Sequence, residues 1–172
     1  MMRTGKDETL SPKYSHFERE RRFLVNVAKC PDLVSLPFVL VEDRYIRGTR
    51  LRLRRMTDSA TGEVAMKLTK KYETDDPLAR PIVTAYLTNS EYEALAVLSA
   101  DVLNKRRYRV ETEGGAFSVD QFLDALDGLV LAEIECRSAD ELKSLSIPDW
   151  VAREVSHDIE YQGGQLARHN KL

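Results

Sequence analysis

The stretch TRLRLRRM, residues 49–56, decides the fold of this chain because it alternates basic and apolar residues with a period of two. Side chains two residues apart lie on the same face of a β-strand, so Arg50, Arg52 and Arg54 share one face and two leucines occupy the other. A solvated face usually mixes charge signs or uses Thr and Ser, since neighbouring like charges repel. The stretch therefore predicts a strand with a wholly cationic face.

The same alternation recurs on most of the other predicted strands. Some faces are mainly acidic, others are mainly basic, and the opposite faces are mostly apolar. The alternating positions are Glu18, Glu20 and Arg22; Lys67, Thr69 and Lys71; Lys105, Arg107 and Arg109; Asp120; and Glu133 and Glu135. The wet face of a one-sided sheet is the alternative explanation for any single strand, because such sheets alternate in this way. The recurrence of the pattern favours charged faces that are turned toward one another.

Working outward from residues 49–56, we predict eight strands with few helices between them. They cover Phe17–Val25, Phe38–Ile46, Thr49–Met56, Glu63–Tyr72, Ile82–Leu87, Lys105–Thr112, Ala116–Phe122 and Leu129–Cys136. Short connections favour antiparallel pairing, and closure hides the sheet edges. The prediction is an α+β fold, mainly β: a closed eight-stranded antiparallel β-barrel, or tunnel, with a charged interior and helices packed outside.

Four short helical segments are predicted. They are one or two turns at Cys30–Leu36, a helix capped by Asn89 or Ser90 that runs to about Ala100, a helix that opens at Ser138 with capping-box spacing, and one near Asp158–Arg168 that Gly163-Gly164 weakens. We expect residues 1–13 to be a flexible tail and residues 14–172 to be a single domain.

Composition excludes several classes of function. With 26 basic and 28 acidic residues the net charge is −2, which argues against binding a nucleic acid polymer. No apolar run approaches the length of a membrane span, and the first residues lack the apolar core of a secretory signal. Cys30 and Cys136 lie far apart, with no CxxC spacing. These features predict a cytoplasmic protein that does not bind membranes.

A charged barrel interior would be unstable if it were dry and unpaired, and it becomes reasonable if it is wet and holds an ionic ligand. Carboxylates at alternate positions suit Mg²⁺ or Mn²⁺, which take oxygen ligands. Arginine and lysine at alternate positions suit phosphate oxygens. An eight-stranded barrel is wide enough for one small ligand, so these faces favour a chelated polyphosphate.

The ordered set of motifs resembles the CYTH domain, or triphosphate tunnel metalloenzyme, superfamily. This superfamily includes thiamine triphosphatase and class IV adenylate cyclase, and the chain is most similar to its bacterial inorganic triphosphatase-like members. The matching motifs are E-x-E-x-K at Glu18–Arg22, R-x-R at Arg50–Arg54, a lysine at Lys67 or Lys71, K-x-R at Lys105–Arg107, an aspartate at Asp120, and E-x-E at Glu133–Glu135. Each motif alone is weak, whereas the ordered set on the face that alternation selects is specific.

The resemblance implies a tunnel open at both ends and a divalent-metal-dependent triphosphatase. The implied metal ligands are Glu18, Glu20, Asp120, Glu133 and Glu135, and the implied phosphate-binding residues are Arg50, Arg52, Arg54, Lys67, Lys71, Lys105 and Arg107. Glu18, Glu20 and Arg22 would take part in the chemistry, with Mg²⁺ or Mn²⁺ as cofactor. Inorganic tripolyphosphate is the first expected substrate, followed by thiamine or nucleoside triphosphate.

Three departures from the family pattern stand out. Arg22 replaces the signature lysine, and it keeps the charge but not the compact ammonium group. The strand at Ile82–Leu87 lacks the glutamate that many bacterial members carry. Near the C-terminus, Arg153 and Glu154 are candidates for further contacts. A non-catalytic polyphosphate- or nucleotide-binding module and an adenylate cyclase of the class IV type stay open as alternatives, as does a homodimer.

Overall fold

The structure, a computed structural model, describes residues 14–169, so the predicted tail of residues 1–13 lies outside the described residues. Within that range the chain is mainly β, with short helices. The strands are β1 (His16–Val25), β2 (Phe38–Ile46), β3 (Leu51–Asp58), β4 (Val64–Lys71), β5 (Ala79–Leu87), β6 (Ala100–Thr112), β7 (Gly115–Phe122), β8 (Val130–Glu135) and β9 (Val151–Glu154). The helices are α1 (Asn89–Ala96), α2 (Ala139–Ser144), α3 (Gly163–His169) and the 3₁₀ turns η1 (Asp124–Leu126) and η2 (Ile159–Tyr161).

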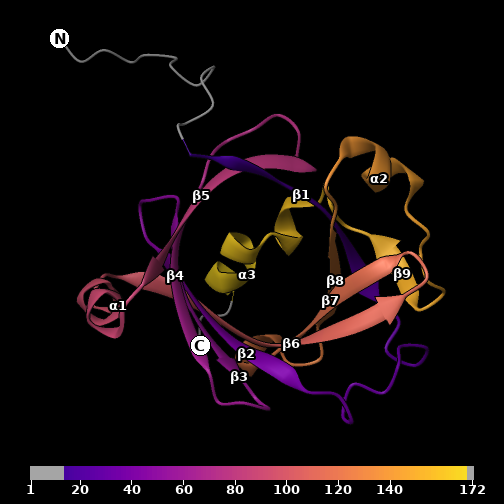
Figure 1. Cartoon of the computed structure of the whole chain (residues 1–172), viewed down its shortest axis with the longest axis horizontal. Helices are drawn as coiled ribbons and strands as arrows, with labels where there is room; N and C mark the ends of the chain where they lie inside the picture. The colour runs from indigo at the N-terminus through magenta and orange to yellow at the C-terminus, as the bar shows by residue number, and fades with distance from the viewer. Residues whose placement is uncertain (1–13, 170–172) are drawn as a thin grey trace.

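The first eight strands form a closed antiparallel barrel, as predicted. The strand order is β5-β4-β3-β2-β6-β7-β8-β1-β9, and an additional pairing of β5 with β1 closes the ring. Figure 1 looks through this ring of strands. Closure leaves β5 and β1 without a free edge on the barrel wall, which removes the usual route to edge-to-edge aggregation.

Strand β1 closes the barrel because it pairs with both β5 and β8. Its first half, His16–Arg19, pairs with β5, and its second half, Glu20–Leu24, pairs with β8. The short strand β9 then pairs with the end of β1 from outside the eight-stranded ring. β1 therefore places its alternating charges between the acidic strand β8 and the first residues of β5.

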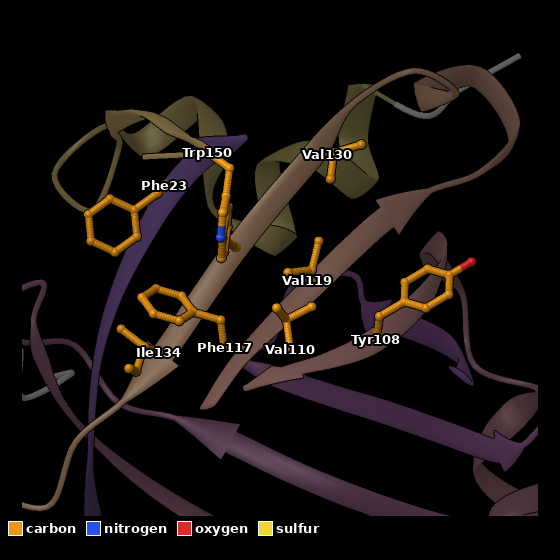
Figure 2. Packing of buried hydrophobic residues seen from close by; sticks show 9 residues of the cluster. Phe23, Tyr108, Val110, Phe117, Val119, Val130, Ile134 and Trp150 are labelled. Atoms are coloured by element: carbon orange, nitrogen blue, oxygen red, sulfur yellow. The ribbon is translucent and has the colours of Figure 1, made fainter. Parts of the chain in front are cut away.

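The largest apolar cluster lies on the outer surface of the barrel wall. Phe23, Phe117 and Trp150 form its aromatic centre, with ring centroids 6.3 Å apart for Phe23–Phe117 and 5.3 Å apart for Phe117–Trp150. Figure 2 shows these rings beside the valines of β6, β7 and β8. Residues of the 26–37 loop, β9 and the segment after α2 pack against the cluster. The apolar faces of the strands thus point outward and are covered, which leaves the charged faces to line the interior.

Helices α1 and α2 lie outside the ring (Figure 1). α1 packs its buried Tyr92 against Leu53 on the outer face of β3. The helix begins at a capping box in which the Thr88 side chain accepts from the Glu91 backbone and the Glu91 side chain accepts from the Thr88 backbone. Among residues 14–169, no helix has the length and apolar character that a membrane crossing requires.

The C-terminal cover, η2 and α3, lies over the bore and projects onto the middle of the ring in Figure 1. Leu166 of α3 packs with Leu103, Phe122 and Leu131, which share the inner faces of β6, β7 and β8 with the charged residues. An apolar cluster and the cover therefore occupy this end of the bore. The chain after β9 therefore folds back against the inner wall of the barrel, and the expectation of a tunnel open at both ends stays a prediction.

Several local predictions are corrected. Cys30–Leu36 forms turns and bends instead of a helix, and its residues pack against the outer apolar cluster. The N-cap of α1 is Thr88, not Asn89 or Ser90, and the helix ends at Ala96, so β6 can begin at Ala100. Strand β9 was not predicted, because it is four residues long and mostly exposed.

Candidate functional site

The bore contains a cavity of about 510 Å³ that is lined mainly by charged side chains. Of the described residues, nine basic and five acidic side chains line it. The basic residues are Arg22, Arg50, Arg52, Arg54, Lys71, Arg80, Lys105, Arg107 and Arg168, and the acidic ones are Glu18, Glu20, Glu73, Glu133 and Glu135. The excess of basic over acidic side chains around this cavity favours a small polyanion as the ligand.

One side of the cavity is an acidic wall made by Glu18 and Glu20 of β1 and Glu133 and Glu135 of β8. The alternation of each strand turns its two glutamates inward. The register then sets the strands side by side, with Glu20 opposite Glu135 and Arg22 opposite Glu133. Segments more than 100 residues apart in the sequence therefore contribute carboxylates to one surface.

Arg22 is the central cation of this wall. Its Nε donates to Glu133 Oε1 at 2.8 Å, and its Nη2 donates to Glu20 Oε1 at 2.9 Å. Its Nη1 donates to the backbone carbonyl of Tyr161 in the C-terminal cover at 2.8 Å. A lysine has a single nitrogen, so the three directed contacts depend on the forked guanidinium. Arg22 thereby ties both acidic strands to the cover.

The acidic wall carries more negative charge than its nearest partners neutralise. Burial raises the pKa of Glu20, and the neighbouring Glu133 carboxylate raises it further. Burial also acts to raise the pKa of Glu133, but the cations around it, Arg22 first, hold that pKa well below its usual range. Glu18 behaves similarly: burial acts to raise its pKa, but Lys71, whose ammonium lies 2.5 Å from Glu18 Oε2, and Arg52 together lower it. Glu20 is therefore the weakly compensated member.

On β2 and β3 a buried carboxylate lies at the centre and arginines surround it, the reverse of the acidic wall around Arg22. Asp43, which has no exposed surface, accepts two hydrogen bonds from Arg54, Nε–Oδ1 at 2.6 Å and Nη2–Oδ2 at 2.7 Å. Arg52 Nε lies 3.7 Å from the same carboxylate, and this buried nitrogen has no hydrogen-bond acceptor within the described part of the chain. Burial opposes the charge of Asp43, yet Arg54 and Arg52 hold its pKa far below the ordinary value.

Asp120 holds two cations of β6 in the same way as Asp43 holds Arg54 and Arg52. Its carboxylate accepts from Lys105 at 2.5 Å and from Arg107 Nε and Nη2, both at 2.7 Å. Arg107 also donates to Glu133 at 2.7 Å, which connects the cations to the acidic wall. Burial lowers the pKa of Lys105 despite the nearby Asp120. Two fully buried aspartates thus orient four of the cations that were predicted to bind phosphate.

The C-terminal cover contacts the bore through Tyr45 as well as through Arg22. The Tyr45 ring lies against Gly163 and Gly164, where a methyl on Gly163 would overlap the phenol oxygen. Burial raises the pKa of Tyr45 to about 12, so the phenol stays protonated. Gln165 and Arg168 of α3 also line the cavity. The helix predicted near Asp158–Arg168 is divided into η2 and α3 directly before this glycine pair, which also provides room for Tyr45.

Eleven of the thirteen predicted site residues line the cavity. They are Glu18, Glu20, Arg22, Arg50, Arg52, Arg54, Lys71, Lys105, Arg107, Glu133 and Glu135. Asp120 lies behind Lys105 and Arg107, outside the lining. Lys67 is not among the lining residues, and its ammonium lies 4.9 Å from the ring centroid of the exposed Tyr86. Of the two lysines that could match the family motif, Lys71 is the one that reaches the cavity.

The two C-terminal candidates lie elsewhere. Glu154 accepts from Arg21 on the outer face of the barrel at 2.9 and 2.6 Å, and Arg153 lies 3.9 Å from Asp158. Asp43, Tyr45 and Arg80 face the bore but were not predicted as site residues. Alternation could have identified the first two, because Val41, Asp43 and Tyr45 occupy one face of a strand that was predicted correctly.

The acidic wall has the donor chemistry of a divalent-cation site. Carboxylate oxygens are the ligands that Mg²⁺ and Mn²⁺ prefer. Burial and the Glu133 carboxylate raise the pKa of Glu20, so a cation beside it would favour its ionised form. Within residues 14–169, however, no three His, Cys, Asp or Glu side chains converge closely enough to chelate an ion. The oxygens of Glu18 and Glu133 are directed at Lys71, Arg22 and Arg107. The donor set fits a metal once these glutamates turn from their cations.

Comparison with known proteins gives one curated relative and several similar structures. An inorganic triphosphatase of Acetivibrio thermocellus is 41% identical over 68 residues, which are 40% of this chain and 42% of that protein. The matched segment therefore spans less than half of the relative. The structure of the inorganic triphosphatase NE1496 superposes with a TM-score of 0.58 and 25% identity, covering 90% of this chain and 95% of the other. No family model matches.

A third similar structure supports the fold alone. The PH1819 protein of Pyrococcus horikoshii OT3 has a TM-score of 0.53 at 16% identity, with 90% of each chain covered. The resemblance inferred from the motifs is confirmed, because a relative and a structural neighbour are both named inorganic triphosphatases. The closed barrel of this chain is the architecture that the resemblance implied.

Proposed function

We propose that this protein hydrolyses a small triphosphate, inorganic tripolyphosphate first, inside the charged bore. One observation supports this above all: an acidic wall and a set of oriented cations face the same cavity of the bore. In a polyphosphate chelated to a divalent cation, the phosphate oxygens complement the cations of the bore and the metal ion complements the acidic wall. The names of the similar proteins support the same activity. Thiamine and nucleoside triphosphates are alternative substrates to be tested beside it.

In this proposal the cations of the lining bind phosphate oxygens. They are Arg50, Arg52, Arg54, Lys71, Lys105 and Arg107. Asp43 and Asp120 hold four of them in place before substrate arrives, and such preorganisation lowers the cost of stabilising charge in the transition state. Lys67 stays a weaker prediction, because its ammonium lies beside Tyr86.

The acidic wall is the proposed site of a divalent cation, Mg²⁺ or Mn²⁺, with Glu18, Glu20, Glu133 and Glu135 as ligands. A cation bound there would polarise a phosphoryl oxygen and offset charge on the leaving oxygen. Asp120 was predicted as a fifth ligand, a role for which Lys105 and Arg107 would have to release it. We also keep the prediction of a cytoplasmic location, which two cysteines that are free of a disulfide support.

Arg22 is proposed to act through charge and position. Its guanidinium cannot accept a proton at ordinary pH, so general-base chemistry falls to the glutamates. If Glu20 and Glu133 held a metal, Arg22 would be free to pair with phosphate oxygens. The C-terminal cover stays attached to the same guanidinium through the Tyr161 carbonyl.

The test is orthophosphate release from tripolyphosphate with Mg²⁺ or Mn²⁺, comparing the wild type with Glu133→Ala and Glu111→Ala. Glu133 joins Arg22 to Arg107, so its loss is expected to lower kcat/KM by about 100-fold or more. Glu111 is the matched control, because its exposed side chain pairs only with Arg109 among the described residues. Its replacement is expected to leave the rate within about twofold.

Full activity of Glu133→Ala would contradict the proposed metal site. Tight binding of tripolyphosphate without phosphate release by the wild type would support a binding module instead. Cyclic AMP and pyrophosphate formed from ATP would support an adenylate cyclase. Separating the products of each reaction mixture distinguishes hydrolysis, binding without turnover and cyclisation.

A further inference from the structure

Strand β5 contributes a cation to the cavity that no motif of the sequence predicted. Alternation along β5 turns Arg80, Ile82 and Thr84 toward the bore, where the Thr84 hydroxyl lies 3.1 Å from that of Thr69 on the neighbouring strand. Arg80 lines the cavity and sits directly opposite Glu18 in the register that closes the barrel. No residue of β5 is acidic, so this strand adds positive charge to the bore and lacks the glutamate that many bacterial members of the similar family carry.

Arg80 differs from the other strand-borne cations of the lining in its contacts. Arg22, Arg52, Arg54, Lys71, Lys105 and Arg107 each have a carboxylate partner. Within residues 14–169, the Arg80 guanidinium has no hydrogen bond or ion pair, and Glu18 opposite it is taken by Lys71. A half-buried guanidinium retains five donors, which suit the oxygens of a phosphate group.

Arg80 lies beside the exposed loop that borders the cavity. It follows the loop whose residues Tyr72, Glu73, Thr74 and Pro77 line the same cavity. The side chain of Glu73 in this loop is 64% exposed, whereas Lys105 and Asp120 are 6% and 0% exposed. An anion seated on Lys105 would therefore reach Arg80 only if it extended from the deep part of the bore toward the solvent.

We propose that Arg80 binds the outermost phosphate group of the substrate and thereby sets the preference for triphosphate over diphosphate. This inference rests on the proposed function, because it takes a linear polyphosphate as the ligand. A diphosphate binds the deep cations and leaves Arg80 without a phosphate contact. In a triphosphate, the third phosphate group contacts the Arg80 guanidinium. The charge of Arg80 then contributes to the binding of the triphosphate and not to that of the diphosphate.

The experiment measures binding of inorganic tripolyphosphate and pyrophosphate by calorimetry in EDTA, where metal-dependent turnover is suppressed. Arg80→Gln is expected to raise the Kd of tripolyphosphate about tenfold and that of pyrophosphate less than twofold. Arg80→Lys is expected to recover part of the selectivity, since it keeps the charge without the fork. Arg106→Gln, on the outer face of β6, is the matched control and should change neither Kd.

An equal loss for both anions, or no loss for either, would overturn the role of Arg80. A selective loss for tripolyphosphate in a protein that releases no orthophosphate would support Arg80 as a triphosphate contact while refuting hydrolysis. Failure of the wild type to bind either anion would overturn both proposals. Melting curves of the three variants establish that each is folded when its affinity is measured.

Discussion

At Asp43 a carboxylate with no exposed surface carries the charge that holds Arg54 and Arg52 in the bore. A buried ion pair contributes little net stability compared with apolar packing, but removing one partner leaves an uncompensated buried charge. Asp120 holds Lys105 and Arg107 in the same way. These aspartates explain how a barrel can keep cations inside in the absence of substrate.

Asp43→Asn is expected to lower the free energy of unfolding at pH 7 by about 3 kcal/mol, because Arg54 would stay buried without its anion. Urea denaturation of the variant and the wild type measures the difference. Asp75→Asn, in an exposed loop, is the matched control and should change stability by less than about 0.5 kcal/mol.

The same pair of proteins gives a dependence on pH with a definite sign. The folded-state pKa of Asp43 is lowered by Arg54 and Arg52 in spite of burial, so its stabilisation is complete above the unfolded pKa of about 4. It is lost as the pH falls below that value toward the folded-state pKa. The stability difference between wild type and variant should therefore shrink below about pH 4. A constant difference from pH 7 to pH 3 would argue against an ionised Asp43.

Among the elements, the C-terminal cover depends on contacts from separate strands. Arg22 of β1 donates to the Tyr161 carbonyl, and Tyr45 of β2 fills the space beside Gly163. Leu166 adds apolar contact with β6, β7 and β8. α3 is only seven residues long, and helices this short are marginal by themselves, so these tertiary contacts must hold it in place.

Gly163→Ala is expected to destabilise the protein by about 1–3 kcal/mol, because the added methyl would overlap the Tyr45 hydroxyl and lie 3.0 Å from ring carbon Cζ. Gly164→Ala is the matched control, since its nearest ring atom would be 3.6 Å away, an ordinary contact. Thermal unfolding of both variants gives the comparison. Similar melting temperatures for the two would show that the Tyr45 contact is not restrictive.

For the molecule as a whole, closure turns the usual arrangement of a β-barrel inside out. The largest apolar cluster lies outside under β9 and the 26–37 loop. Inside, charged residues and a smaller apolar cluster under the C-terminal cover surround a cavity of about 510 Å³. Like charges across this cavity repel one another, so an oppositely charged ligand should stabilise the folded state beyond its local contacts.

Tripolyphosphate with Mg²⁺ or Mn²⁺ is expected to raise the melting temperature by about 5–10 °C at a concentration 100 times its Kd, where linkage supplies about 2.7 kcal/mol. Differential scanning fluorimetry during the first minutes of mixing measures the shift. Sulfate at the same ionic strength controls for screening and should give a much smaller shift. Equal shifts with both anions would contradict specific binding in the bore.

Much of the fold and of the site could be predicted because alternation is a local property. Once Arg50, Arg52 and Arg54 were assigned to a strand, their shared face followed, and the same rule turned Glu133 and Glu135 inward. Strand β9 was missed because four residues carry too little pattern, and the 30–36 segment was misassigned because its packing is set by the outer cluster. Lys67 shows the limit of the rule, since facing inward does not place a side chain in the cavity.

Local alternation thus determined which charges lie inside and which apolar residues lie outside, because the geometry of a strand depends only on neighbouring residues. Which charged side chains contact one another was decided only by the tertiary structure. The contacts of Asp43 with Arg54, of Asp120 with Lys105, and of Arg22 with the Tyr161 carbonyl join positions from 11 to 139 residues apart. Such contacts follow from register and closure, and no local pattern in the chain encodes the register between distant strands.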